Sequence, residues 1–170
     1  MFEFSTLNEA LAEVSQGDRS ITFVEGKLDN RVLTYTQLHQ HALQLLHHLQ
    51  QAGLAAGDQL ILFTKNTQQF VEAFWACILG GIVPVPVAVG ISDEHRAKLM
   101  RIFNKLEKPF LFTEEEHLQR LIKFADSNDM YESMAIVKQK TILVDSLQQH
   151  GNQGVQHSPA PRDIAFIQFS

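Results

Sequence analysis

The sequence predicts an α/β fold in which helices flank both faces of a mostly parallel sheet, with an N-terminal β-hairpin. Short runs of β-branched and aromatic residues alternate at least three times with segments whose apolar residues recur at helical spacing. Two β-prone runs, 21–24 and 31–35, enclose a stretch rich in turn residues, which is typical of a hairpin. Alternating strands and helices joined by right-handed crossovers give a parallel sheet covered on both faces.

Capping patterns place the first two helices. Thr6 and Glu9 have the spacing of a capping box, in which each residue satisfies an amide at the helix start, and Thr34 and Gln37 repeat it. A short helix is therefore expected after Thr6 and a longer one after Thr34. The apolar residues of the longer helix recur on one face: Leu38, Ala42, Leu45, Leu46 and Leu49.

The next strand and helix are predicted to be buried. The apolar run 60–63 reads as a strand, and Asn66 is a suitable cap for a helix over about 67–79 that is apolar on most sides. The glycines at 80 and 81 end that helix. The following segment, 82–87, contains two prolines that cannot donate ladder hydrogen bonds, which favours an edge or the end of a strand.

The second half of the chain continues the alternation. Ser92 begins a helix that Pro109 closes, and residues 110–113 form a short strand. Thr113 and Glu116 repeat the capping-box spacing, which predicts that Thr113 caps the next helix.

The last third is less regular. Residues 126–140 carry no clear pattern, and residues 141–144 predict a strand. Residues 150–163 are rich in Gly, Pro, Gln and His, which indicates a surface loop, and residues 164–169 predict a final strand.

Composition excludes several classes of function. The net charge is −5 and no two basic residues are adjacent, which argues against nucleic acid as a partner. The single cysteine, Cys77, lies among apolar residues, so we expect a buried thiol and a reducing, cytoplasmic environment. The uncharged stretch 73–91 has roughly the length of a membrane span, but two glycines and two prolines interrupt it, so no span is expected.

Common catalytic and metal-binding patterns are missing. The sequence has no glycine-rich phosphate loop, no paired cysteine spacing and no nucleophile elbow. Four histidines, His39, His41, His47 and His48, lie on one predicted helix, but none is three or four residues from another, as a helical metal pair requires. We therefore expect a solvated face there and assign no catalytic or metal-binding residue.

Three segments resemble the adenylate-forming, or AMP-binding, enzymes, a superfamily that includes acyl-CoA synthetases, fatty-acyl-AMP ligases and the adenylation domains of nonribosomal peptide synthetases. Segment 33–38 is similar to the leucine-threonine-tyrosine opening motif, with Gln37 where Glu is usual, and segment 76–86 is similar to the helix-glycine-strand segment that ends in valine-proline. Segment 163–170 looks like the strand that enters the family's ATP loop. The resemblance places Ser170 where the first hydroxyl of that loop would be, which makes it the one candidate cofactor-binding residue.

The resemblance implies a function for a longer protein. Residues 1–170 would be the N-terminal part of the large AMP-binding domain, cut off before the phosphate loop and inactive alone. The parent would use ATP and Mg²⁺ to convert a carboxylic acid, in this branch a fatty acid, into an acyl-adenylate. It would pass the acyl group to coenzyme A or to the phosphopantetheine of an acyl or peptidyl carrier protein. The partners implied are the remainder of the adenylation domain and that carrier.

The branch of the family follows from segment 87–90, Val-Ala-Val-Gly, and the polar helix after it. Amino-acid-activating domains usually have leucine-aspartate and a proline-rich turn there, so the departure looks more like fatty-acyl-AMP ligases and the starter modules of polyketide and peptide synthetases. An amino-acid adenylation domain and a non-catalytic α/β binding or docking module stay open as alternatives. A receiver-like module is disfavoured because the residues after strand 60–63 are Thr, Lys and Asn, with no carboxylate.

Overall fold

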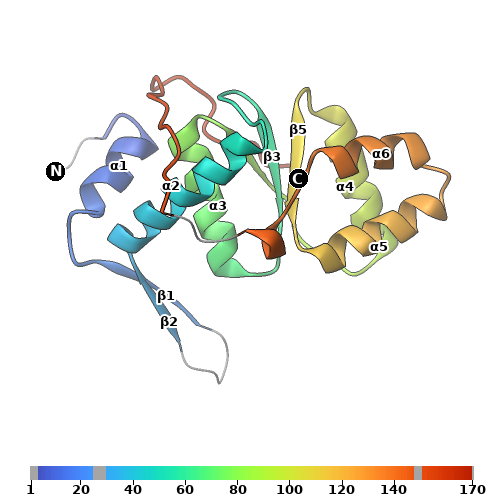
Figure 1. The fold of residues 1–170 in the computed structure, drawn as a ribbon, viewed down its shortest axis with the longest axis horizontal. Coiled ribbons are helices and arrows are strands. Elements are labelled where there is room, and N and C mark those ends of the chain that lie inside the picture. The colour runs from blue at the N-terminus through green and yellow to red at the C-terminus, as the bar shows by residue number, and fades with distance from the viewer. Residues whose placement is uncertain (1–3, 25–29, 148–150, 170) are drawn as a thin grey trace.

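The computed structural model describes residues 4–24, 30–147 and 151–169 (Figure 1). Its centre is a four-stranded parallel sheet with the strand order β4-β3-β5-β6, and a two-stranded antiparallel hairpin, β1-β2, extends away from it. The predicted fold class is confirmed. The strands are β1 (Ser20–Phe23), β2 (Arg31–Thr34), β3 (Gln59–Phe63), β4 (Val83–Pro86), β5 (Pro109–Thr113) and β6 (Thr141–Leu143).

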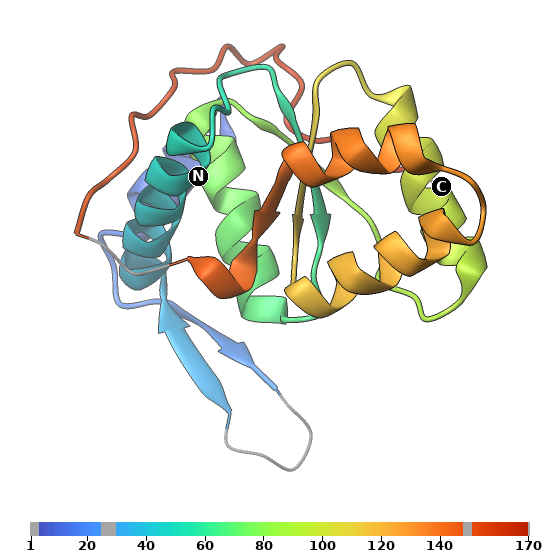
Figure 2. The same cartoon turned by 45° about the vertical axis from the view of Figure 1, so that its right-hand side comes forward.

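Helices cover the two faces of the sheet in two groups (Figure 2). Successive side chains of β3 point to opposite faces of the sheet. Leu60 and Leu62 pack with one group of helices, whereas Ile61 and Phe63 pack with the other. The first group is α1 (Leu7–Val14), α2 (Tyr35–Gln51) and α3 (Thr67–Gly80). The second is α4 (Asp93–Lys105), α5 (Glu115–Asp126) and α6 (Tyr131–Gln139).

The capping predictions for the first three helices are confirmed, with one variation. Thr34 and Gln37 form a complete capping box at α2, and the Asn66 side chain accepts from the amide of α3's third residue at 3.0 Å. Thr6 caps α1, but the Glu9 carboxylate accepts from the amide of Ser5 instead of that of Thr6, at 2.8 Å.

The predicted capping box of Thr113 and Glu116 is wrong. Thr113 is fully buried as the last residue of β5, and its hydroxyl donates to the carbonyl of Phe63 in the neighbouring strand at 2.8 Å. This bond turns the side chain of Thr113 towards β3 while its backbone still belongs to β5, so α5 begins at Glu115 after Glu114 as the N-cap.

The region 126–140, which showed no clear pattern, contains the helix α6. Met130, Met134 and Val137 recur at helical spacing, and Met134 and Val137 are buried against the second core cluster. Only three positions carry this signal, which is why the helix was not recognised from the sequence.

The predicted final strand over 164–169 is also wrong. These residues lie beside β4, and the amide of Ile167 donates to the carbonyl of Pro84 at 3.1 Å. A parallel ladder would return a bond from the amide of residue 86 to the carbonyl of Ile167, but Pro86 has no amide hydrogen. The segment therefore follows the edge without becoming a strand, while Ile167 and Phe169 pack against the core.

Residues 151–163 form the predicted loop, which passes over α2 and α3. The amide of Gly154 donates to Leu43 at 2.7 Å and that of His157 to Leu79 at 2.8 Å, both to backbone carbonyls. The side-chain amide of Gln50 makes two bonds with the backbone of Val155, one in each direction, at 2.8 and 2.9 Å.

The uncharged stretch 73–91 divides as predicted into the end of α3, a turn and β4. Gly81 ends the helix with φ of 66°, a left-handed conformation that favours glycine. Among the described residues, no helix is both long enough and apolar enough to cross a bilayer. Cys77 is buried in α3, as expected.

Candidate functional site

The order of the strands defines where the sheet can present functional groups. The chain leaves β3 through α3 towards β4, which lies on one side of β3. It leaves β5, on the other side of β3, through α5 and α6 towards β6, which lies farther from β3. The connections at the carboxyl ends of the neighbouring strands β3 and β5 therefore run in opposite directions. In open α/β sheets this topological switch point is where ligands usually bind.

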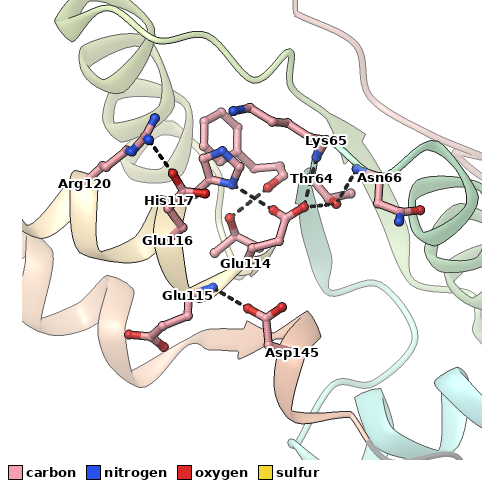
Figure 3. A network of polar contacts seen from close by, with 11 residues as sticks. Thr64, Lys65, Asn66, Glu114, Glu115, Glu116, His117, Arg120 and Asp145 are labelled. Atoms are coloured by element: carbon pink, nitrogen blue, oxygen red, sulfur yellow. Dashed lines mark hydrogen bonds and ion pairs between the residues drawn. The ribbon is translucent and has the colours of Figure 1, made fainter. Parts of the chain in front are cut away.

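In this chain a clasp of side chains joins the loops at that point (Figure 3). We use the term clasp for Thr64, Lys65, Glu114 and His117. Oε1 of Glu114 accepts from the hydroxyl of Thr64 at 2.6 Å and from the amide of Lys65 at 3.1 Å, while Oε2 contacts Nδ1 of His117 at 2.9 Å. One carboxylate thus ties the loop after β3 to the beginning of α5.

The carboxylate and the imidazole of the clasp are well buried. The side chains of Glu114 and His117 are 18% and 6% exposed. Burial raises the pKa of Glu114, but the hydrogen bonds from Thr64, His117 and backbone amides outweigh it and leave the pKa below its ordinary value. Because a carboxylate only accepts, Nδ1 of His117 carries the hydrogen, and Nε2 is buried with no hydrogen-bond partner among the described residues.

A second carboxylate extends this connection to β6. Oδ2 of Asp145, which follows β6, accepts from the amide of Glu115 at 2.8 Å (Figure 3). The loops after β3, β5 and β6 are therefore held together by the chain's own carboxylates. The carboxylate of Glu114 at this switch point disfavours an anionic ligand there.

A cavity lies beside the clasp, at the carboxyl end of β4. It has a volume of about 610 Å³, within the usual range for ligand sites, and it reaches from Thr64 to the last described residues, Gln168 and Phe169. Its floor is apolar, from Phe70, Val87, Val89, Ile102 and Phe169, and Glu94, His95 and Lys98 of α4 stand at its rim.

The candidate residue Ser170 lies outside the described residues. Its neighbour in the chain, Phe169, lines the 610 Å³ cavity, so the segment that the resemblance connects with ATP runs along this cavity. Within the described ranges, no three His, Cys, Asp or Glu side chains are grouped closely enough to hold a metal ion.

The helical histidines differ from the solvated face expected for them. His39, His41, His47 and His48 are all partly buried, and Nδ1 of His41 contacts Oε1 of Glu72 on α3 at 2.8 Å. Burial lowers the pKa of His39. Sequence reasoning missed this pair and the clasp, because the His41–Glu72 contact and the bonds from Glu114 to the loop after β3 join residues that are 31 to 50 positions apart.

The comparisons with known proteins agree on a family. The family model described as AMP-binding enzyme matches residues 10–170. Fatty acid--[acyl-carrier-protein] ligase ScoC of Streptomyces coeruleorubidus is 39% identical over 59 residues, which are 35% of this chain and 11% of that protein.

Solved structures give the same picture of the fold. The structure of McyG A-PCP complexed with phenylalanyl-adenylate superposes with a TM-score of 0.85 at 27% identity, over 100% of this chain and 31% of that one. Fatty acid AMP ligase from Legionella pneumophila superposes with a TM-score of 0.77 at 21% identity, over 96% of this chain and 28% of that one, a likeness of fold alone. The chain therefore spans less than a third of the length of each of these proteins.

Proposed function

The chain belongs to the AMP-binding enzyme family, the adenylate-forming acid–AMP ligases, and from this premise we propose that its parent protein activates a fatty acid. We further propose that residues 1–170 are the N-terminal part of its large domain. The observation that carries the proposal is the continuous family match over residues 10–170, on a fold shared with ligases and adenylation domains.

In the proposed reaction a carboxylate oxygen of the acid attacks the α-phosphorus of ATP. The bond from that phosphorus to the bridging oxygen breaks, pyrophosphate leaves with the bonding electrons, and acyl-AMP forms. Enzymes of this family use ATP together with magnesium, and the magnesium ion offsets the negative charge of the phosphates. A thiol of coenzyme A or of a carrier protein's phosphopantetheine then takes the acyl group and releases AMP. The name of ScoC, which pairs a fatty acid with an acyl carrier protein, supports the carrier as acceptor.

The residues described here serve this reaction as scaffold. The clasp fixes the carboxyl ends of β3 and β5, and the bond from Ile167 to Pro84 holds the segment that leads to Ser170 against β4. We propose that residues 1–170 alone neither catalyse adenylation nor bind ATP tightly, because the resemblance places the other adenylation residues beyond position 170.

Pyrophosphate exchange tests the proposal. The complete protein that contains these residues is incubated with ATP, Mg²⁺, labelled pyrophosphate and fatty acids of graded chain length, and the 170-residue chain is assayed in parallel. We expect exchange with fatty acids for the complete protein and none for the 170-residue chain. Absence of exchange with every carboxylic acid would overturn the ligase assignment, and exchange by the 170-residue chain would overturn its assignment as scaffold.

One observation favours a second candidate, amino-acid adenylation. The McyG structure, which contains phenylalanyl-adenylate, is 27% identical to this chain, and the match covers 100% of this chain and 31% of that one. The same assay separates the two candidates, since exchange with amino acids but not with fatty acids supports this second function.

A further inference from the structure

Helix α4 carries three cations on one face. Lys98, Arg101 and Lys105 follow one another at spacings of three and four residues, which places their side chains along one side of the helix. Within the described ranges none of the three forms an ion pair, whereas Nη1 of Arg96 on the same helix lies 2.6 Å from Oδ1 of Asp93. We call Lys98, Arg101 and Lys105 the cation row.

The row is unfavourable for the chain on its own. Like charges at helical spacing repel one another, and a shortage of acidic residues is not the reason, since the chain has 19 of them against 14 basic ones. The negative end of the helix dipole stabilises Lys105 in the last turn, but its effect does not extend to Lys98 or Arg101. An anion from outside the described chain would therefore stabilise the row.

The side chains of the row meet around one hollow. A cavity of about 400 Å³ is lined by the three cations together with Ile102 and Phe169. The ammonium of Lys105 lies 5.9 Å from the centre of the Phe169 ring, within the range of a cation–π contact. Carboxylates docked here would be partly shielded from water by this apolar floor, which strengthens their attraction to the cations.

The shape of the row indicates the kind of anion that fits it. From Lys98 to Lys105 the helix rises about 10 Å at 1.5 Å per residue, and the row is one residue wide. Acidic residues lie at both ends, Glu94 in the first turn of α4 and Glu107 just after the helix. A flat anionic bilayer would meet these carboxylates as well, whereas a helix with carboxylates at the same spacing pairs with the row alone.

We propose that the cation row is the docking surface for an acidic helix of the carrier protein that receives the acyl group. This proposal rests on the proposed function and adds to it the surface by which the parent recognises its acceptor. Lys98 also lines the 610 Å³ cavity, so a carrier docked on the row stands beside the segment that leads to Ser170. Arg101 and Lys105 recognise the carrier and take no part in the formation of acyl-AMP.

Acyl transfer by the complete protein tests this surface. Arg101→Glu with Lys105→Glu should raise the KM for holo-acyl carrier protein by about tenfold or more, because two attractions become repulsions. Pyrophosphate exchange should not change, nor should transfer to free pantetheine, a thiol without an acidic protein surface. An unchanged KM for the carrier in this row variant would overturn the proposal.

A matched control separates docking from net charge. Lys123→Glu with Lys138→Glu, at exposed lysines of α5 and α6, changes the net charge by the same amount. It should leave the KM for the carrier within about twofold of the wild type, because these positions lie outside the row. An equal rise of the KM in both variants would overturn the assignment to α4.

Salt gives a measurement on the wild type alone. The KM for the carrier should rise steeply with the NaCl concentration, because screening weakens the charge pairs, while transfer to pantetheine should not change. A carrier KM that is independent of salt would overturn the proposal even if the row variant failed to fold, which urea unfolding of each variant reveals.

Direct binding to the 170-residue chain identifies the class of anion. A helical peptide with glutamates spaced by three and four residues is compared at low salt with its glutamine counterpart and with phosphatidylglycerol vesicles. We expect the acidic peptide to bind at least about tenfold more tightly than the glutamine peptide. Equal binding of the two peptides, or binding of the vesicles in place of the acidic peptide, would overturn a protein partner.

The two assays also separate this proposal from the proposed function. Normal pyrophosphate exchange with an unchanged KM for the carrier would refute the docking surface and keep the ligase. Absence of exchange with any acid would refute the ligase, whereas binding of the acidic peptide to the 170-residue chain would still show that the row takes an acidic helix.

Discussion

Removing the carboxylate of Glu114 is the most direct test of how the loops at the carboxyl edge of the sheet are held. Glu114→Ala leaves three donors without their acceptor: the hydroxyl of Thr64, the amide of Lys65 and Nδ1 of His117. Water can reach the first two, which should cost about 1 kcal/mol each or less, whereas the buried imidazole should cost about 1–3 kcal/mol. We therefore expect a loss of about 2–4 kcal/mol in the free energy of unfolding.

Urea unfolding at pH 7 measures this loss as a lower midpoint with an unchanged m-value. Glu116→Ala is the matched control, because it removes a carboxylate from the same helical turn but breaks only an exposed pair with Arg120. That pair should contribute well below about 1 kcal/mol. If the Glu114 variant is no less stable than the Glu116 variant, the clasp does not hold the loops together.

Acid should reduce the effect of the same substitution. Because the pKa of Glu114 is lower in the folded chain than its ordinary value of 4.5, the carboxylate contributes stability above that pH, and the contribution disappears as the pH falls through the folded pKa. The part of the difference between wild type and Glu114→Ala that comes from the ionised carboxylate should therefore shrink as the pH falls below the ordinary value. A difference that grows towards acid pH would contradict the sign of the shift.

Three further outcomes follow from the structure. Gly154→Ala should destabilise the chain by about 1 kcal/mol or more, because its Cβ would lie 2.5 Å from a side chain of α2, while Gly151→Ala, with open space around it, should have little effect in urea. Gln50→Ala removes both bonds to Val155, so amide hydrogen exchange at Val155 should become faster. Cys77 should not react with a thiol reagent until the chain unfolds, because burial raises the pKa of its thiol; rapid labelling of the native chain would contradict this.

Local chemistry accounts for the part of the fold that the sequence predicted. The complete capping box of Thr34 and Gln37 and the cap at Asn66 depend on residues no more than three positions apart. The strand at 60–63 follows from its apolar run alone. The sequence therefore predicted the order of the main helices and strands, and the family resemblance built on them led to the right fold.

The failures share one physical cause, a partner that is distant in sequence. Thr113 and Thr34 have the same local pattern, but the hydroxyl of Thr113 bonds to Phe63, 50 residues away. The clasp at the switch point could not be predicted for the same reason. The absence of a strand at 164–169 has one signal in the sequence, the prolines at 84 and 86, which lack the amide hydrogens that a neighbouring strand needs.

These two prolines also affect how copies of the chain can meet. The outer edge of β4 offers carbonyl acceptors at Pro84 and Pro86 but no amide donors at either position. Two such edges brought together would set carbonyl against carbonyl, so sheets of separate copies cannot extend one another through β4. Exposed sheet edges are common starting points for aggregation, and here the proline pattern protects that edge while it still accepts the bond from the chain's own Ile167.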